Sequence, residues 1–192
     1  GKLEYKSKIK KLRQYHVDFN KEVQEIKICY GKGVEFINNI FKTLESILHG
    51  VYLTKELTKK VIDNLMSFGE KISSHILWYY LQGKELLPEN NYKFEDVLLI
   101  DSTQLIVTDS NFGNAHVDFE KTIQYFYHLK KKNGLYAPGK IWIIPGFIAS
   151  EKNGRITTLG RGGSDYTAAI LGYLLEAEEV IIYTDVDGIM TA

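Results

Sequence analysis

Apolar residues recur every three or four positions through much of the first half of the chain, which is the spacing of one face of an α-helix. One such series runs between residues 57 and 79 and comprises Leu57, Val61, Leu65, Phe68, Ile72, Ile76 and Tyr79. An earlier series runs from Val23 to Leu48, is weakened at Gly31-Lys32-Gly33 and ends near Gly50. The first half is therefore predicted to form amphipathic helices.

The second half has a different pattern, in which short apolar runs alternate with helical periodicity. The apolar runs span residues 97–100, 141–144 and 180–183, and the helical patterns span residues 118–132 and 164–175. Strands that are separated by helices pair in parallel through right-handed crossovers. This alternation predicts a layered α/β fold.

The position of these elements suggests one domain over residues 1–192, with a mainly helical part at residues 1–84 and an α/β part at residues 92–192. Lys152-Asn153-Gly154 lies between apolar residues and predicts a β-hairpin at about residues 147–159. The chain starts with glycine and stops directly after a loop signal, so we expect a fragment that is truncated at both ends.

Composition excludes several classes of partner. The 24 basic and 24 acidic side chains give a formal net charge of zero, which removes the electrostatic case for nucleic-acid binding. No apolar run approaches the roughly 20 residues that cross a bilayer. A single cysteine, Cys29, can form no internal disulfide, and no signal segment opens the chain. We therefore expect a cytoplasmic protein.

A glycine-rich segment, TTLGRGGSDYTAAI at residues 157–170, leads from the predicted hairpin into a helix. Glycines let a backbone approach a ligand closely, and the free N–H groups of a helix N-terminus favour an anion. Arg161 adds a planar fork that suits a carboxylate or a phosphate. The segment matches neither the dinucleotide fingerprint nor the P-loop. It predicts an anion site, and the alternative is a flexible turn with Ser164 or Asp165 as the helix N-cap.

Two other segments contain candidate functional groups. In VIIYTDVDGIMTA, at residues 180–192, Thr184 and Asp185 follow an apolar strand and could hold a ribose or a magnesium ion; the alternative is an ordinary Asp-Gly turn. In MSFGEKISS, at residues 66–74, Glu70 lies beside small residues and could meet a cationic ligand group, or be a solvated glutamate. The histidines show no metal-ligand spacing, and no metal site is predicted.

Four collinear segments together resemble the catalytic domain of aspartate kinases, which have the amino-acid kinase fold. They are MSFGE, NFGNAHVDFEKT, PGFIASEKNGRITTLGRGGSDYTAAILGYLLEAEE and IIYTDVDGIMTA, and the match runs from about residue 54 to residue 192. VDFEKT with TDVDGIMT is also similar to bifunctional members that carry a homoserine dehydrogenase. The resemblance implies a three-layer α/β/α sandwich with a mostly parallel central sheet.

The resemblance implies transfer of the ATP γ-phosphoryl group to the side-chain carboxylate of L-aspartate, giving 4-phospho-L-aspartate for lysine, threonine and methionine synthesis. Arg161 would then bind the substrate α-carboxylate, Glu70 its α-ammonium, and Ser164 would add a hydrogen bond. Gly162 and Gly163 would allow close approach of the substrate. Phe147 would line the site.

The nucleotide side of the site is implied in the same way. Asp165 would orient the catalytic lysine of the family, and Thr184 and Asp185 would contact the nucleoside of ATP, which enters with Mg²⁺. The family's Lys-Phe-Gly-Gly-Thr segment, which carries that lysine, is absent from these residues, and so is the Asp-Pro-Arg that follows the last motif. We therefore expect little or no catalysis by this chain alone, and a homo-oligomer for the full-length enzyme.

Two alternatives belong to other classes. IIYTDVDGIMT resembles the haloacid-dehalogenase phosphatase motif, in which Asp185 would be a nucleophile and Asp187 an acid/base. That motif opens its domain, whereas here it is almost the last segment, and Ile189 occupies the position of its threonine. The other alternative is a non-catalytic module that binds amino acids or assembles with a partner.

Overall fold

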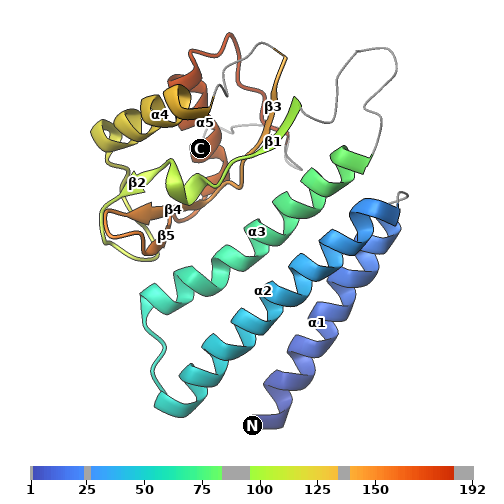
Figure 1. The fold of residues 1–192 in the computed structure, drawn as a ribbon. Coiled ribbons are helices and arrows are strands. Elements are labelled where there is room, and N and C mark those ends of the chain that lie inside the picture. The colour runs from blue at the N-terminus through green and yellow to red at the C-terminus, as the bar shows by residue number, and fades with distance from the viewer. Residues whose placement is uncertain (1, 24–26, 84–95, 134–138, 184–192) are drawn as a thin grey trace, which may run out of the picture.

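The computed structural model describes residues 2–23, 27–83, 96–133 and 139–183. Three long helices, α1 (Lys2–Val23), α2 (Lys27–Thr54) and α3 (Lys59–Gly83), lie side by side and account for the helical periodicity of the first half. Figure 1 shows α3 between the other two helices and the strands. One apolar core joins the three helices, with Ile37 and Phe41 fully buried.

Helix α2 differs from expectation at its glycines. Gly31 and Gly33 do not interrupt α2, which continues past Gly50 to Thr54. At Gly33 the reason is packing, because a Cβ there would lie 2.6 Å from Oδ1 of Asn20, a fully buried residue of α1. Tertiary packing therefore outweighs the low helix propensity of glycine.

The strands follow in two small sheets. β1 (Val97–Leu99) pairs in parallel with β3 (Ile141–Ile143). β4 (Ile148–Glu151) pairs in parallel with β2 (Val107–Thr108), and antiparallel with β5 (Ile156–Thr158) in the hairpin expected from Lys152-Asn153-Gly154. A 3-10 turn at Ser102–Gln104 connects β1 to the second sheet.

Two helices cover the strands on the side away from α3, as Figure 1 shows. They are α4 (Phe119–Asn133) and α5 (Gly163–Leu175), and they match the helical patterns predicted at residues 118–132 and 164–175. A second apolar core joins them to the sheet and includes Ile106, Phe126, Ala149, Leu159 and Ile170. The described residues thus form helix, strand and helix layers, and the α/β class is confirmed.

The strand predicted at residues 180–183 is wrong for this structure. These residues have no strand geometry, and Ile181 and Tyr183 are 61% and 93% exposed. Helix α5 ends at Leu175, and its C-cap residue Glu176 is in the left-handed conformation. No described strand pairs with the segment that follows. β propensity alone does not form a strand without a neighbouring backbone to bond.

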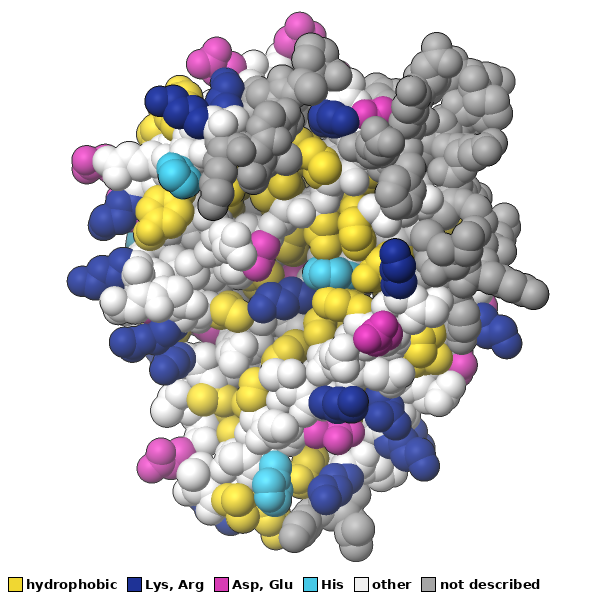
Figure 2. Space-filling view, in the orientation of Figure 1, with side chains coloured by type: hydrophobic (Ala, Val, Ile, Leu, Met, Phe, Trp, Pro, Cys, Tyr) yellow, Lys and Arg dark blue, Asp and Glu magenta, His cyan; other side chains and the backbone are white. Residues whose placement is uncertain are grey.

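The surface agrees with the balanced composition. Figure 2 shows lysine and arginine side chains interspersed with aspartate and glutamate over the visible face. None of the described helices combines the length and the apolar character that a bilayer span requires.

Candidate functional site

A pocket of about 700 Å³ lies where α3 faces two loops of the α/β part. Helix α3 contributes four of its lining residues, the loop at residues 111–114 contributes another four, and the remainder come from the residue before β4, from β5 and from the glycine-rich turn. The lining residues are Lys59, Ile62, Asp63, Met66, Asn111, Phe112, Gly113, Asn114, Phe147, Thr158, Gly160 and Arg161. Two residues predicted for the site, Phe147 and Arg161, therefore share one cavity.

The glycine-rich turn opens α5 without a side-chain cap. Gly160 and Gly162 have φ values of 76° and 72°, in the left-handed region that favours glycine. Gly162 is the N-cap residue and makes no side-chain hydrogen bond, so the alternative of Ser164 or Asp165 as N-cap is wrong. Both residues instead lie exposed in the first turn of the helix, because the left-handed glycine already directs the chain into it.

Gly163 of this turn and Gly146 outside it let the turn pack closely against the segment at residues 146–147. A Cβ on Gly163 would lie 2.8 Å from Cδ2 of Phe147, and a Cβ on Gly146 would lie 3.0 Å from Cα of Ser164. Phe147 itself has a φ of 67°, which is strained for a residue with a side chain. It is fixed there because its N–H donates to Oγ1 of Thr167 at 3.0 Å. The aromatic ring is thereby held beside the turn.

The charges in the pocket favour an anionic ligand. Lys59 and Arg161 both line the pocket, and neither forms an ion pair with any described residue. The one carboxylate in the lining, Asp63, is fully buried and already accepts three hydrogen bonds. Two free cations therefore remain to attract a carboxylate or a phosphate.

Asp63 connects three segments that are distant in sequence. Its Oδ2 accepts hydrogen bonds from the N–H groups of Gly113 at 2.9 Å and Thr158 at 3.1 Å, and its Oδ1 accepts from Oγ1 of Thr158 at 2.9 Å. These bonds join α3 to the loop at residues 111–114 and to β5. Sequence reasoning missed this residue, because its only local signal is a lone aspartate on an amphipathic helix.

Glu70 lies on the face of α3 that lines the pocket, just beyond the last lining residue of this helix. Lys59, Asp63, Met66 and Glu70 are spaced by four, three and four residues, which places them along one side of the helix. Glu70 is one turn beyond Met66, is partly buried, and is not in the pocket lining. Burial raises the pKa of the Glu70 carboxyl above its ordinary value. A carboxylate in that environment gains from a cationic partner.

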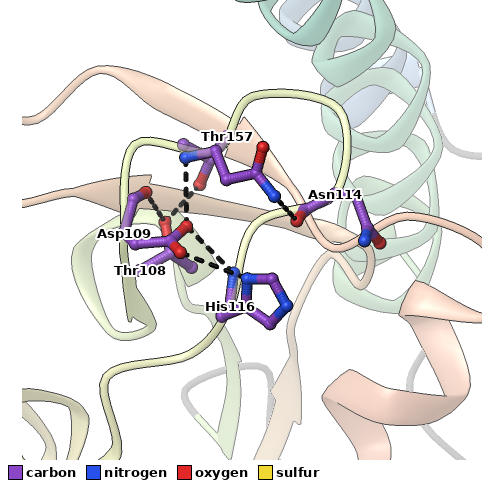
Figure 3. Close-up of polar contacts among 6 residues, drawn as sticks. Thr108, Asp109, Asn114, His116 and Thr157 are labelled. Atoms are coloured by element: carbon purple, nitrogen blue, oxygen red, sulfur yellow. Dashed lines mark hydrogen bonds and ion pairs between the residues drawn. The ribbon is translucent and has the colours of Figure 1, made fainter.

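The loop that faces α3 is closed by Asp109, as Figure 3 shows. Oδ1 of Asp109 accepts hydrogen bonds from the N–H groups of Asn111 and His116, both at 3.0 Å, and Oδ2 lies 3.1 Å from Nδ1 of His116. Beneath the loop, Oγ1 of Thr108 and Oγ1 of Thr157 are 2.7 Å apart. Although desolvation alone would raise the pKa of Asp109, the donors from Asn111 and His116 lower it.

The remaining predicted residues are less informative. Asp165 is exposed and forms no ion pair with a described residue. Thr184, Asp185 and Asp187 lie outside the described residues, so neither the nucleoside contact nor the phosphatase alternative has structural support. Within the part of the chain that the structure describes, no group of three or more His, Cys, Asp or Glu residues could hold a metal ion.

Comparison with known proteins gives one consistent family. Residues 7–192 match the amino acid kinase family. Among curated proteins, the chain is 34% identical over 156 residues to bifunctional aspartokinase/homoserine dehydrogenase 2, chloroplastic, of Arabidopsis thaliana, covering 81% of this chain and 16% of that protein. It is 32% identical over 179 residues to lysine-sensitive aspartokinase 3 of Escherichia coli, covering 88% of this chain and 36% of the relative.

Solved structures agree with the sequence relatives. E. coli aspartokinase III in complex with lysine and aspartate (T-state) has a TM-score of 0.79 at 28% identity, covering 97% of this chain and 38% of that one. The same enzyme in complex with aspartate and ADP (R-state) has a TM-score of 0.66 at 31% identity, covering 80% and 31%. The chain thus spans between 16% and 38% of the length of these relatives.

Proposed function

Because the chain belongs to the amino acid kinase family, we propose that it forms part of the catalytic domain of an aspartate kinase. That enzyme transfers the γ-phosphoryl group of ATP to the side-chain carboxylate of L-aspartate. The observation that carries the proposal is the position of Arg161, which lines the pocket opposite α3 and forms no ion pair with a described residue. The partly buried Glu70 lies on α3 one turn beyond the lining residue Met66. Both solved E. coli relatives hold aspartate, one together with lysine and the other together with ADP.

Substrate recognition uses opposite charges at two ends of the amino acid. Arg161 binds the α-carboxylate through its guanidinium fork, and Glu70 binds the α-ammonium group. Ser164 adds a hydrogen bond from the first turn of α5, where the space beside Gly162 is open to the substrate and Gly163 admits the ring of Phe147. Phe147 closes one side. An amino acid held in this way leaves its side-chain carboxylate free to accept the phosphoryl group.

Phosphoryl transfer requires positioning and charge neutralisation more than covalent help from the protein. Asp165 orients the lysine that approaches the transferring group, and Thr184 and Asp185 contact the nucleoside. Mg²⁺ bound with ATP would supply the neutralisation of phosphate charge.

The chain alone is proposed to bind aspartate but to turn it over slowly if at all. Asp165 has no ion pair with a described lysine, although the proposed mechanism needs a cation beside it. The 192 residues would represent one partial catalytic domain of an enzyme that is a homo-oligomer at full length. A coupled ADP-release assay with aspartate in excess should give no more than a small rate above the background ATP hydrolysis.

Calorimetric titration tests the proposed substrate. L-aspartate should bind saturably, and succinate should bind at least about tenfold more weakly, because without an ammonium group it leaves Glu70 unpaired. D-aspartate should also bind more weakly, since its side chain points in another direction when Arg161 holds the α-carboxylate and Glu70 holds the ammonium group. Equal binding of all three ligands would contradict the proposal.

The raised pKa of Glu70 predicts opposite effects on binding and on stability. A raised carboxyl pKa stabilises the fold at low pH, and this contribution is lost as pH rises through the folded-state pKa. Glu70→Gln should therefore be more stable than the wild type at pH 7 in urea unfolding. Binding has the reverse requirement, because the ammonium group of the substrate needs an ionised Glu70. The affinity of the wild type for L-aspartate should therefore fall when the pH is lowered from above the usual glutamate pKa range.

The glutamine variant provides the control for that pH dependence. It should bind L-aspartate more weakly at pH 7 and should lack the step on acidification. If Glu70 were a solvated glutamate that contacts no ligand, its substitution would leave the affinity unchanged. That outcome would remove Glu70 from the proposed site.

A further inference from the structure

We propose that Asn114 is a further substrate-recognition residue of this site and that Asp109 is its positioning residue. The inference rests on the proposed function and extends it to a second wall of the pocket, the loop at residues 109–116, here called the recognition loop. Arg161 and Glu70 hold the two charged groups of the amino acid. Asn114 supplies a neutral contact beside Arg161.

The side chain of Asn114 lies directly against the glycine-rich turn. A Cβ on Gly160 would overlap Oδ1 of Asn114, so the absence of a side chain at Gly160 is what lets the amide occupy this place. Gly160, Arg161 and Asn114 all line the same pocket. The amide is therefore next to the residue that binds the α-carboxylate.

The backbone of Asn114 is fixed while its side chain is free. Its N–H donates to the carbonyl of Asn111 at 3.2 Å, and its own carbonyl accepts from Nδ2 of Asn111 at 2.9 Å. The side-chain amide makes no hydrogen bond to any described residue. A primary amide can donate to a carboxylate and accept from an ammonium group, so it suits either end of a zwitterion.

Asp109 holds the recognition loop in the conformation that aims Asn114 at the turn. Its carboxylate bonds the N–H groups of Asn111 and His116 and lies beside the His116 ring, which closes the loop at both ends (Figure 3). Two further bonds fix the loop to the rest of the site, from Gly113 N–H to Asp63 and from Ala115 N–H to the Thr158 carbonyl. The fixed conformation of the recognition loop therefore determines where the Asn114 side chain meets the ligand.

Substitutions at Asn114 test the direct contact. Asn114→Ala should weaken L-aspartate binding about tenfold, the effect of losing one hydrogen bond to a charged group. Asn114→Asp should weaken it further, because a second carboxylate would face the substrate carboxylate. The matched control is Asn39→Ala, at an exposed position of α2 far from the pocket, which should bind as the wild type does.

Substitutions at Asp109 test the positioning role. Asp109→Ala removes all three contacts and should weaken L-aspartate binding by about the same factor as Asn114→Ala. Asp109→Asn keeps an oxygen for the two backbone donors and should restore most of the affinity. In the double variant Asp109→Ala/Asn114→Ala, the losses should not add, because both substitutions remove one contact.

The outcomes separate this inference from the proposed function. If the wild type does not bind L-aspartate, the proposed function is wrong. If the wild type binds, and folded Asn114→Ala binds with unchanged affinity, the direct contact is overturned while the proposed function stands. Additive losses in the double variant would overturn the positioning role of Asp109 alone.

Discussion

Replacing Arg161 by alanine should abolish measurable binding of L-aspartate while leaving the fold intact. The side chain is exposed and has no ion pair with a described residue, so little in the structure depends on it. In the complex, its fork would form a charge-assisted pair with the α-carboxylate, worth roughly 3 kcal/mol or on the order of a hundredfold in Kd. Calorimetry at equal protein concentration and circular dichroism would measure the two effects.

Arg155 provides the matched control. It is also an exposed arginine, on the far part of the hairpin, where its Nε lies 3.5 Å from Oε1 of Glu151 and it does not line the pocket. Arg155→Ala should bind L-aspartate as the wild type does. Arg161→Lys keeps the charge but not the fork and should be intermediate. Unchanged affinity in Arg161→Ala would show that Arg161 does not bind the α-carboxylate of the substrate.

Replacing Asp63 by alanine should destabilise the protein by about 3–5 kcal/mol, because three donors in a buried region lose their acceptor. These donors are the N–H groups of Gly113 and Thr158 and the hydroxyl of Thr158. Asp63→Asn should recover only part of the loss, since its NH₂ group would face a donor. Urea unfolding followed by circular dichroism would measure the change.

A surface aspartate is the control for this effect. Asp18 on α1 is exposed and only accepts a hydrogen bond from Nε2 of Gln14 at 2.9 Å. Asp18→Ala should change the free energy of unfolding by no more than about 0.5 kcal/mol. If Asp63→Ala is no less stable than this control, Asp63 does not connect α3 to β5 as described.

Elements with strong periodicity were predictable from the sequence. The patterns that predict helices at residues 118–132 and 164–175 correspond to α4 and α5, and the apolar runs at residues 97–100 and 141–144 correspond to β1 and β3. Each of these signals is local. The run at residues 180–183 has the same local signal but forms no strand, because a strand also needs a partner that the local pattern does not specify.

The candidate site was predictable only where a single segment carries the chemistry. The residue types of the glycine-rich turn alone indicate an anion site with Arg161, and Phe147 lines the same pocket as Arg161. Asp63 could not be found in this way, since its partners are 50 and 95 residues away in the chain. Asp109 and Asn114 were missed because they act through the folded shape of the recognition loop, which depends on both of those distant contacts.

The most direct test of the central claim is an L-aspartate titration of the chain followed by backbone amide resonances. Proposed binding at this site predicts saturable shifts that concentrate at Gly113, Asn114, Phe147 and the segment 160–164, with Glu70 shifting on α3. Arg161→Ala should remove them. Saturable shifts that cluster elsewhere, or none at all up to high ligand concentration, would contradict the claim that this pocket binds aspartate.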